Sequence, residues 1–87
     1  MDVYRLSVAR SARKELRAMD RAVAMRIIAR LESLARIPRP SGCTKLEGAA
    51  DLWRIRVGDY RIIYAIDDRA RTVDVTIVRH RRDVYRL

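Results

Sequence analysis

An alternation of apolar and polar residues from Trp53 to Val57, followed by Gly58-Asp59 and a second apolar-rich run to Tyr64, most constrains this fold. Successive side chains of a β-strand point to opposite faces of a sheet, so alternation predicts half-buried strands. A Gly-Asp pair between two such runs is typical of a two-residue hairpin loop. We therefore predict a β-hairpin over residues 52–66.

The hairpin turn fixes which residues lie opposite each other. One face pairs apolar side chains, which are expected to pack rather than recognise a ligand: Val57 with Tyr60, Ile55 with Ile62, and Trp53 with Tyr64. The other face sets Arg56 opposite Arg61, with Arg54 next along. Like charges directly opposite each other destabilise a sheet, whereas guanidinium groups match the geometry of phosphate. An anion site is favoured over a solvated face, which usually mixes both signs of charge.

Chain length and composition fit one small globular domain over residues 1–87. The net charge of +9 at pH 7 favours a polyanionic partner, such as RNA, DNA or an acidic protein. A genomic bias toward arginine is the alternative explanation, because all but two of the 20 basic residues are arginine. Such a bias explains arginine over lysine better than it explains the net charge.

The order of predicted elements indicates an α+β fold, with an N-terminal strand, two helices and a three-stranded antiparallel meander. We expect a strand at 3–8, a helix at 9–19 and a second helix that Asp20 caps and that Pro38 and Pro40 end. Residues 38–51 are expected to form a connecting loop. The last strand, 72–79, should turn Val73, Val75 and Ile77 toward the core, and residues 80–87 should leave the sheet.

A second basic cluster, Arg79-His80-Arg81-Arg82, comes near the C-terminus and is followed by Tyr85. A histidine among arginines is disfavoured in its cationic form, so His80 could act as a base near neutral pH. The simpler interpretation is an exposed surface histidine. Tyr85 could stack on a base or bind a phosphate, or could pack the tail onto the sheet.

Several classes of chemistry lack their residues in this sequence. Cys43 is the only cysteine, the glutamates are scattered, and there is no metal-ligand spacing or Gly-rich phosphate loop, so no metal or cofactor is expected. The sequence shows no signal-peptide core and no apolar run of membrane-spanning length, which predicts a cytoplasmic protein. An enzyme of this composition needs metal-free chemistry, and RNA cleavage by the substrate's own 2′-OH is the natural candidate.

Three segments resemble the RelE toxins of toxin–antitoxin pairs: Lys45-Leu46-Glu47-Gly48, residues 52–68 and residues 80–86. The resemblance implies a microbial-RNase-like fold, cleavage of mRNA in the ribosomal A site, and neutralisation by a co-expressed antitoxin. It also implies a metal-free endoribonuclease. A ParE-like toxin, which shares the fold and poisons DNA gyrase, is the alternative, and a non-catalytic RNA-binding module is a third.

The resemblance also implies site residues. The family's basic residues on the first hairpin strand fall on Arg54 and Arg56, its hairpin arginine on Arg61, its later arginine on Arg81, and its C-terminal tyrosine on Tyr85. Arg56 is a poor base because an arginine stays protonated, so either His80 substitutes or proton transfer falls to ribosomal RNA or water. Further phosphate-binding residues are expected nearby: Lys45, Arg79 and Arg82.

Overall fold

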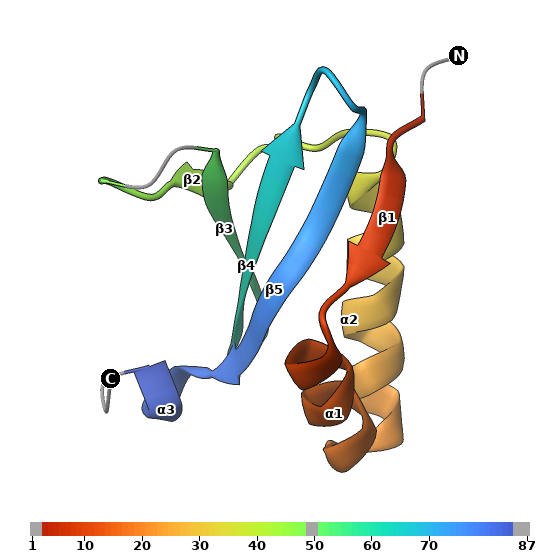
Figure 1. The fold of residues 1–87 in the computed structure, drawn as a ribbon. Helices are drawn as coiled ribbons and strands as arrows, with labels where there is room; N and C mark the ends of the chain where they lie inside the picture. Colours follow the sequence, from red (N-terminus) through yellow and green to blue (C-terminus); the bar gives the residue numbers. More distant parts are fainter. Residues whose placement is uncertain (1–2, 49–50, 85–87) are drawn as a thin grey trace.

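A computed structural model describes residues 3–48 and 51–84, which form one five-stranded sheet and three helices (Figure 1). The elements are β1 (Arg5–Val8), α1 (Arg10–Ala18), α2 (Arg21–Leu34), β2 (Thr44–Lys45), β3 (Leu52–Val57), β4 (Tyr60–Asp67), β5 (Thr72–His80) and α3 (Arg81–Val84). The strands lie in the order β1-β5-β4-β3-β2. The predicted α+β fold is confirmed, and β2 and α3 are additions to it.

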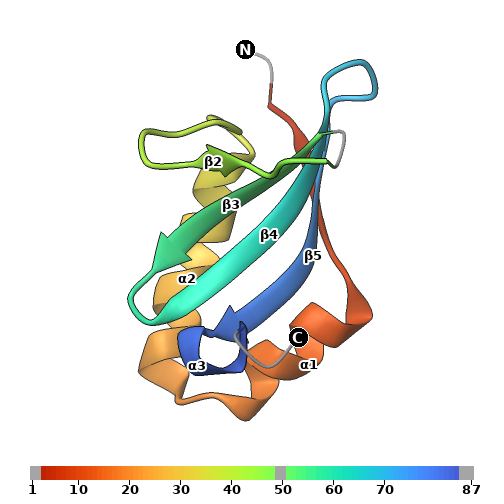
Figure 2. The same cartoon turned by 90° about the vertical axis from the view of Figure 1, so that its left-hand side faces the viewer.

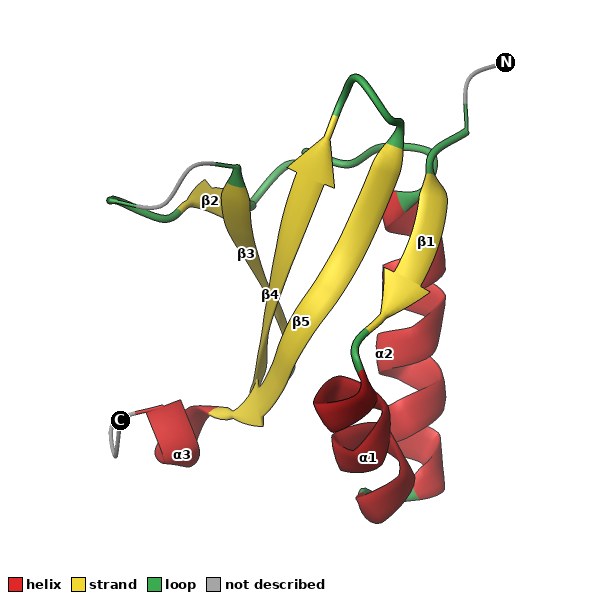
Figure 3. Ribbon diagram, viewed as in Figure 1, coloured by secondary structure: helices red, strands yellow, loops and turns green. Residues whose placement is uncertain are grey.

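The two long helices cover one face of the sheet, and α3 lies on the other side (Figure 3). Asp20 caps α2 as predicted, since its side chain accepts a hydrogen bond of 3.2 Å from the Ala22 amide. The buried face of α2 carries Ile27, Leu31 and Leu34, each at most 2% exposed. This apolar stripe packs on the sheet, which leaves the opposite face of the sheet open (Figure 2).

The central hairpin has the predicted register. Ile55 lies opposite Ile62, and Trp53 lies opposite Tyr64. Ile55, Ile62 and Tyr64 are at most 1% exposed and belong to the core. The buried Tyr64 hydroxyl donates a hydrogen bond of 2.8 Å to the Pro38 carbonyl, so the connection that follows α2 is tied to the sheet.

The last strand departs from simple alternation. Ile63 pairs with Ile77 and Tyr64 pairs with Val75, so Thr76 is an extra residue in β5, and its hydroxyl donates to the Ile63 carbonyl at 3.2 Å. Such a β-bulge reverses which residues face the core beyond it. The prediction that Ile77 faces the core is therefore wrong.

Val78, which is 1% exposed, takes the core position instead of Ile77. The bulge also reverses the faces of the two residues that follow, Arg79 and His80. Arg79 lies opposite Arg61 on the open face, and His80 lies opposite Tyr60 on the face that the helices cover. The β-bulge thus decides which of these side chains join the basic surface.

Candidate functional site

Arginines from three adjacent strands lie side by side on the open face of the sheet. Arg56 of β3 is the register partner of Arg61 of β4, and Arg61 is the partner of Arg79 of β5. We call these residues the arginine row. The hairpin turn sets the first pair and the bulge at Thr76 sets the second. Like charges at such short cross-strand distances raise the free energy of the sheet, and an anion offsets their repulsion.

A groove of about 340 Å³ lies beside Arg56 and Arg61, next to the hairpin turn. We call it the anion groove; it is lined by Arg56, Gly58, Asp59, Tyr60, Arg61 and Arg81. Asp59 is the only acidic residue among the described residues that line it. Guanidinium groups stay protonated and offer several donors in a fixed fork, so the groove favours a phosphate-like anion.

Arg81 reaches the groove because α3 is anchored to the hairpin. Its backbone amide donates a hydrogen bond of 2.7 Å to the Asp59 carbonyl, directly beyond the end of β5. The chain turns into α3 at this point, and Figure 2 shows α3 in front of the end of β5. The turn therefore brings Arg81 beside Arg56 and Arg61 at the groove.

The structure places His80 away from these arginines. Its ring packs edge-on against Tyr60, with 5.2 Å between ring centroids and an angle of 83°. Both residues line a separate cavity of about 340 Å³ that also includes Val23 and Arg26 of α2. Because His80 Nδ1 accepts a hydrogen bond of 3.3 Å from the Arg82 amide, His80 caps the first turn of α3.

The other predicted phosphate-binding residues are dispersed. Arg54 lines a neighbouring groove, and exposed Arg82 lies in α3, directly after Arg81. Lys45 pairs with Trp53, so the register assigns it to the opposite face from Arg54. Tyr85 lies outside the described residues.

Three of the residues that line the anion groove were not predicted as site residues: Gly58, Asp59 and Tyr60. Gly58 and Asp59 form the hairpin turn and Tyr60 follows it, so the position of that turn is the signal that could have identified them.

Comparison with known proteins assigns the chain to a family. The family model that matches residues 6–85 describes the ParE toxin of the parDE type II toxin–antitoxin system. The chain belongs to the ParE toxin family. Strong structural matches to RelE proteins place this toxin in the broader RelE/ParE superfamily, as the sequence resemblance indicated. No curated protein sequence gives a significant match.

Three solved structures illustrate the similarity. The archaeal RelE–RelB complex from Pyrococcus horikoshii matches with a TM-score of 0.82 and 28% identity, over 91% of this chain and 96% of that one. The RelBE2 toxin–antitoxin complex from Mycobacterium tuberculosis matches with a TM-score of 0.81 and 28% identity, over 93% and 94%. A mutant E. coli RelE toxin in the free state matches with a TM-score of 0.78 and 27% identity, over 97% and 92%.

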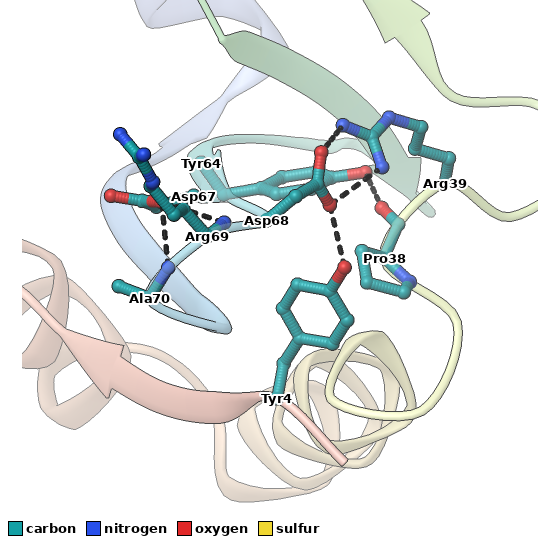
Figure 4. Close-up of polar contacts among 8 residues, drawn as sticks. All are labelled: Tyr4, Pro38, Arg39, Tyr64, Asp67, Asp68, Arg69 and Ala70. Atoms are coloured by element: carbon teal, nitrogen blue, oxygen red, sulfur yellow. Dashed lines mark hydrogen bonds and ion pairs between the residues drawn. The ribbon is translucent and has the colours of Figure 1, made fainter. Parts of the chain in front are cut away.

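A second polar cluster of the toxin lies at the far end of the sheet, beside the β4–β5 turn (Figure 4). Asp68 accepts a hydrogen bond of 2.5 Å from the Tyr4 hydroxyl and forms an ion pair of 2.8 Å with Arg39. The bonds from Arg39 and Tyr4 lower the pKa of Asp68, and the bond to Asp68 raises the pKa of Tyr4. We call this group the Tyr4–Arg39–Asp68 cluster.

The described part of the toxin offers no further site of the common kinds. Within residues 3–48 and 51–84, no group of histidine, cysteine and acidic side chains is placed to hold a metal ion. Cys43 is half-buried and carries a free thiol. None of the helices that the structure describes is long and apolar enough to cross a membrane.

Proposed function

We propose that this toxin is a ribosome-dependent mRNA endonuclease that inhibits translation. The observation that carries the proposal is the convergence of Arg56, Arg61 and Arg81 on one groove. Three permanently charged donors suit a pentavalent phosphorane, whose negative charge exceeds that of the phosphodiester. The similarity to RelE toxins over most of the chain supports the same assignment.

The reaction requires no group beyond the RNA itself as nucleophile. The 2′-OH attacks the adjacent phosphorus, the P–O5′ bond breaks, and the products are a 2′,3′-cyclic phosphate and a 5′-OH. The protein must hold the strand so that the 2′ oxygen and the leaving oxygen are in line. In the proposal Arg56, Arg61 and Arg81 bind the non-bridging oxygens and stabilise their charge as the phosphorane forms.

Two protons move in this reaction, one from the 2′-OH and one to the leaving 5′ oxygen. Arg56 cannot accept the first, because a guanidinium remains protonated at any physiological pH. His80 is the other candidate from the sequence. It lies on the helix-covered face, however, and its Nδ1 accepts a hydrogen bond from the Arg82 amide. We therefore assign proton transfer to ribosomal RNA or water, and positioning and charge stabilisation to the toxin.

We further propose that a cognate antitoxin neutralises the toxin. Similar RelE proteins from P. horikoshii and M. tuberculosis were solved as complexes with their antitoxins. On α2, Met25 and Ile28 are 58% and 37% exposed and lie one helical turn apart. A partner with an apolar helix face and an acidic segment suits both this surface and the net charge of +9. An adjacent reading frame for a small acidic protein is expected.

Induced expression in bacteria tests the assignment. We expect protein synthesis to stop within minutes, and mapping of mRNA 5′ ends to show new ends inside coding regions. Arg61→Ala is the matched control and should produce neither effect. Supercoiling of plasmid DNA by gyrase should be unchanged.

Gyrase inhibition is the second candidate function, because the matching family model describes ParE. Loss of supercoiling while translation continues would establish gyrase as the target and refute the endonuclease proposal. Binding of mRNA with neither effect would support the non-catalytic module.

A further inference from the structure

A second basic groove adjoins the anion groove. Its volume is about 390 Å³, and it is lined by Arg30, Ser41, Gly42, Thr44, Arg54, Ile55 and Arg56. Arg56 lines both grooves, so the two lie next to each other along β3. Among the described residues, no acidic side chain lines the second groove. A cavity between like charges that lacks a carboxylate strongly favours an anionic occupant.

Three separate elements create this groove. The short strand β2 pairs with β3 only at Trp53 and Arg54. No residue of β2 therefore lies opposite Arg56, which lines the groove. Arg30 comes from α2, which lies behind the sheet. The connection between α2 and β2 contributes Ser41, and the first residue of β2 contributes Thr44. Arginines far apart in sequence therefore meet at the open edge of β3.

We propose that this groove binds a second phosphate of a single-stranded RNA, adjacent to the phosphate that occupies the anion groove. The inference deepens the proposed function, since it rests on the anion groove holding RNA. Arg54 and Arg56 are two residues apart on β3, a separation of about 7 Å. Neighbouring phosphates of an extended strand are spaced on the same scale, so Arg56 can lie between them.

The chemistry of the lining supports RNA over an acidic peptide. Guanidinium forks and hydroxyl donors are the groups that commonly contact phosphate oxygens in nucleic-acid complexes. The position of Arg56 between the two grooves also favours one strand that contacts both. A second phosphate contact would fix the direction and register of the RNA and place one linkage, rather than its neighbour, over Arg61 and Arg81.

Fluorescence anisotropy with 2′-O-methyl oligonucleotides tests the proposal, because these ligands bind without being cleaved. A dinucleotide with one phosphate should fill only the anion groove, whereas a tetranucleotide with three phosphates reaches the second. We expect Arg30→Gln to weaken tetranucleotide binding about fivefold or more and to leave dinucleotide binding unchanged. The slope of log affinity against log salt should fall by about 0.7 for the tetranucleotide.

Arg21→Gln is the matched control. It removes the same charge from an exposed position of α2 that lines neither groove. Thr44→Val, on a different element, should also weaken only the tetranucleotide, and it carries the test if Arg30→Gln lowers the melting temperature.

Equal effects of Arg30→Gln and Arg21→Gln on the tetranucleotide would overturn the inference. So would an unchanged RNA affinity together with weaker binding of an acidic antitoxin peptide. The length dependence can also hold while the wild-type toxin neither stops protein synthesis nor cuts mRNA. In that case the second phosphate site stands and the endonuclease proposal fails.

Discussion

The two ends of the sheet use arginine in opposite ways. At the β4–β5 turn, Arg39 is paired with Asp68 at 2.8 Å and also lies over the Trp53 ring, 5.0 Å from its centroid. At the hairpin end, Arg56 is opposed by Arg61, and Arg61 by Arg79. The first arrangement joins loops that are distant in sequence. The second concentrates charge of one sign at a groove.

We expect this difference to separate arginines that stabilise the fold from arginines that bind an anion. An arginine paired with a carboxylate and an aromatic ring contributes to the folded state, although modestly at an exposed site. Repulsion between two facing arginines raises the free energy of the folded state, and a bound anion offsets that repulsion. Substitution of Arg39 should therefore mainly lower stability, whereas substitution within the arginine row should mainly lower activity.

The largest expected effect is that of Arg61→Ala, because Arg61 is the centre of the arginine row. Loss of a charge directed at the phosphorane should cost roughly 2.7–4 kcal/mol of transition-state stabilisation. Cleavage should fall by about a hundredfold or more. Single-turnover cleavage of mRNA on purified ribosomes measures this, with circular dichroism to show that the fold is retained.

Arg39→Ala is the control from the other end of the sheet. It removes the same side chain, so it should lower the melting temperature while the folded fraction keeps its full activity. An Arg61→Ala toxin that still cleaves at the wild-type rate would refute the role of the groove. Equal losses of activity in the two variants would refute the separation of the two ends.

Substitution of His80 should have a smaller effect, because His80 acts on Arg81 through the cap of α3. Loss of a helix cap costs about 0.5–2 kcal/mol, so His80→Ala should lower activity about thirtyfold or less by releasing Arg81. Asparagine also accepts a hydrogen bond at a cap. His80→Asn should therefore retain most of the activity, with the same pH–rate profile as the wild type.

A general base gives a different result. Both His80→Ala and His80→Asn would then lose 10²–10⁴-fold in rate, on the order expected for acid–base assistance, together with the pH inflection. That outcome would move His80 into the catalytic machinery and would contradict its assignment as a cap. Measurement of kcat and KM across pH 5–9 for the three proteins distinguishes the two roles.

Sequence predicts the parts of this site that local pattern controls. The pairing of Arg56 with Arg61 follows from the position of a two-residue turn and from alternation along two strands. The extra residue at Thr76 has no comparable local signal, because Thr76-Ile77-Val78 fits a strand in either register. The assignment of Ile77 to the core failed for this reason, and the positions of Arg79 and His80 depended on the same bulge.

Arg30 illustrates a second limit. It is one of three arginines on α2, and nothing near it in sequence distinguishes it from Arg26. Its contribution to the second groove depends on where β2 stops pairing with β3, which is set by tertiary packing. Long-range arrangement of this kind is not encoded in periodicity.

Relief of repulsion in the arginine row gives a third, smaller effect. Arg56→Thr replaces one of two directly opposed charges with a residue that favours strands. It should raise the free energy of unfolding by about 0.2–1 kcal/mol, while cleavage falls. Urea denaturation at low ionic strength measures the gain, and added salt should diminish it, because screening already weakens the repulsion in the wild type. A variant that is less stable at every salt concentration would contradict the like-charge argument.

The smallest expected effect is at the opposite end, where Asp68→Asn removes the paired charge of the Tyr4–Arg39–Asp68 cluster. Bonds from Arg39 and Tyr4 lower the pKa of Asp68 below its reference value of 3.8, so the folded state favours the carboxylate. The stabilisation from this shift is fully present above the unfolded-state value and is lost as the pH falls through the folded-state value. Wild type should therefore melt slightly above Asp68→Asn from pH 7 to pH 5, and the two curves should converge below about pH 4.

Asp74→Asn, which removes an exposed carboxylate near the other end of β1, controls for the change in net charge. A melting-temperature difference that stays constant down to pH 2 would show that the asparagine acts through packing, and the contrast between paired and opposed arginines would lose its electrostatic basis.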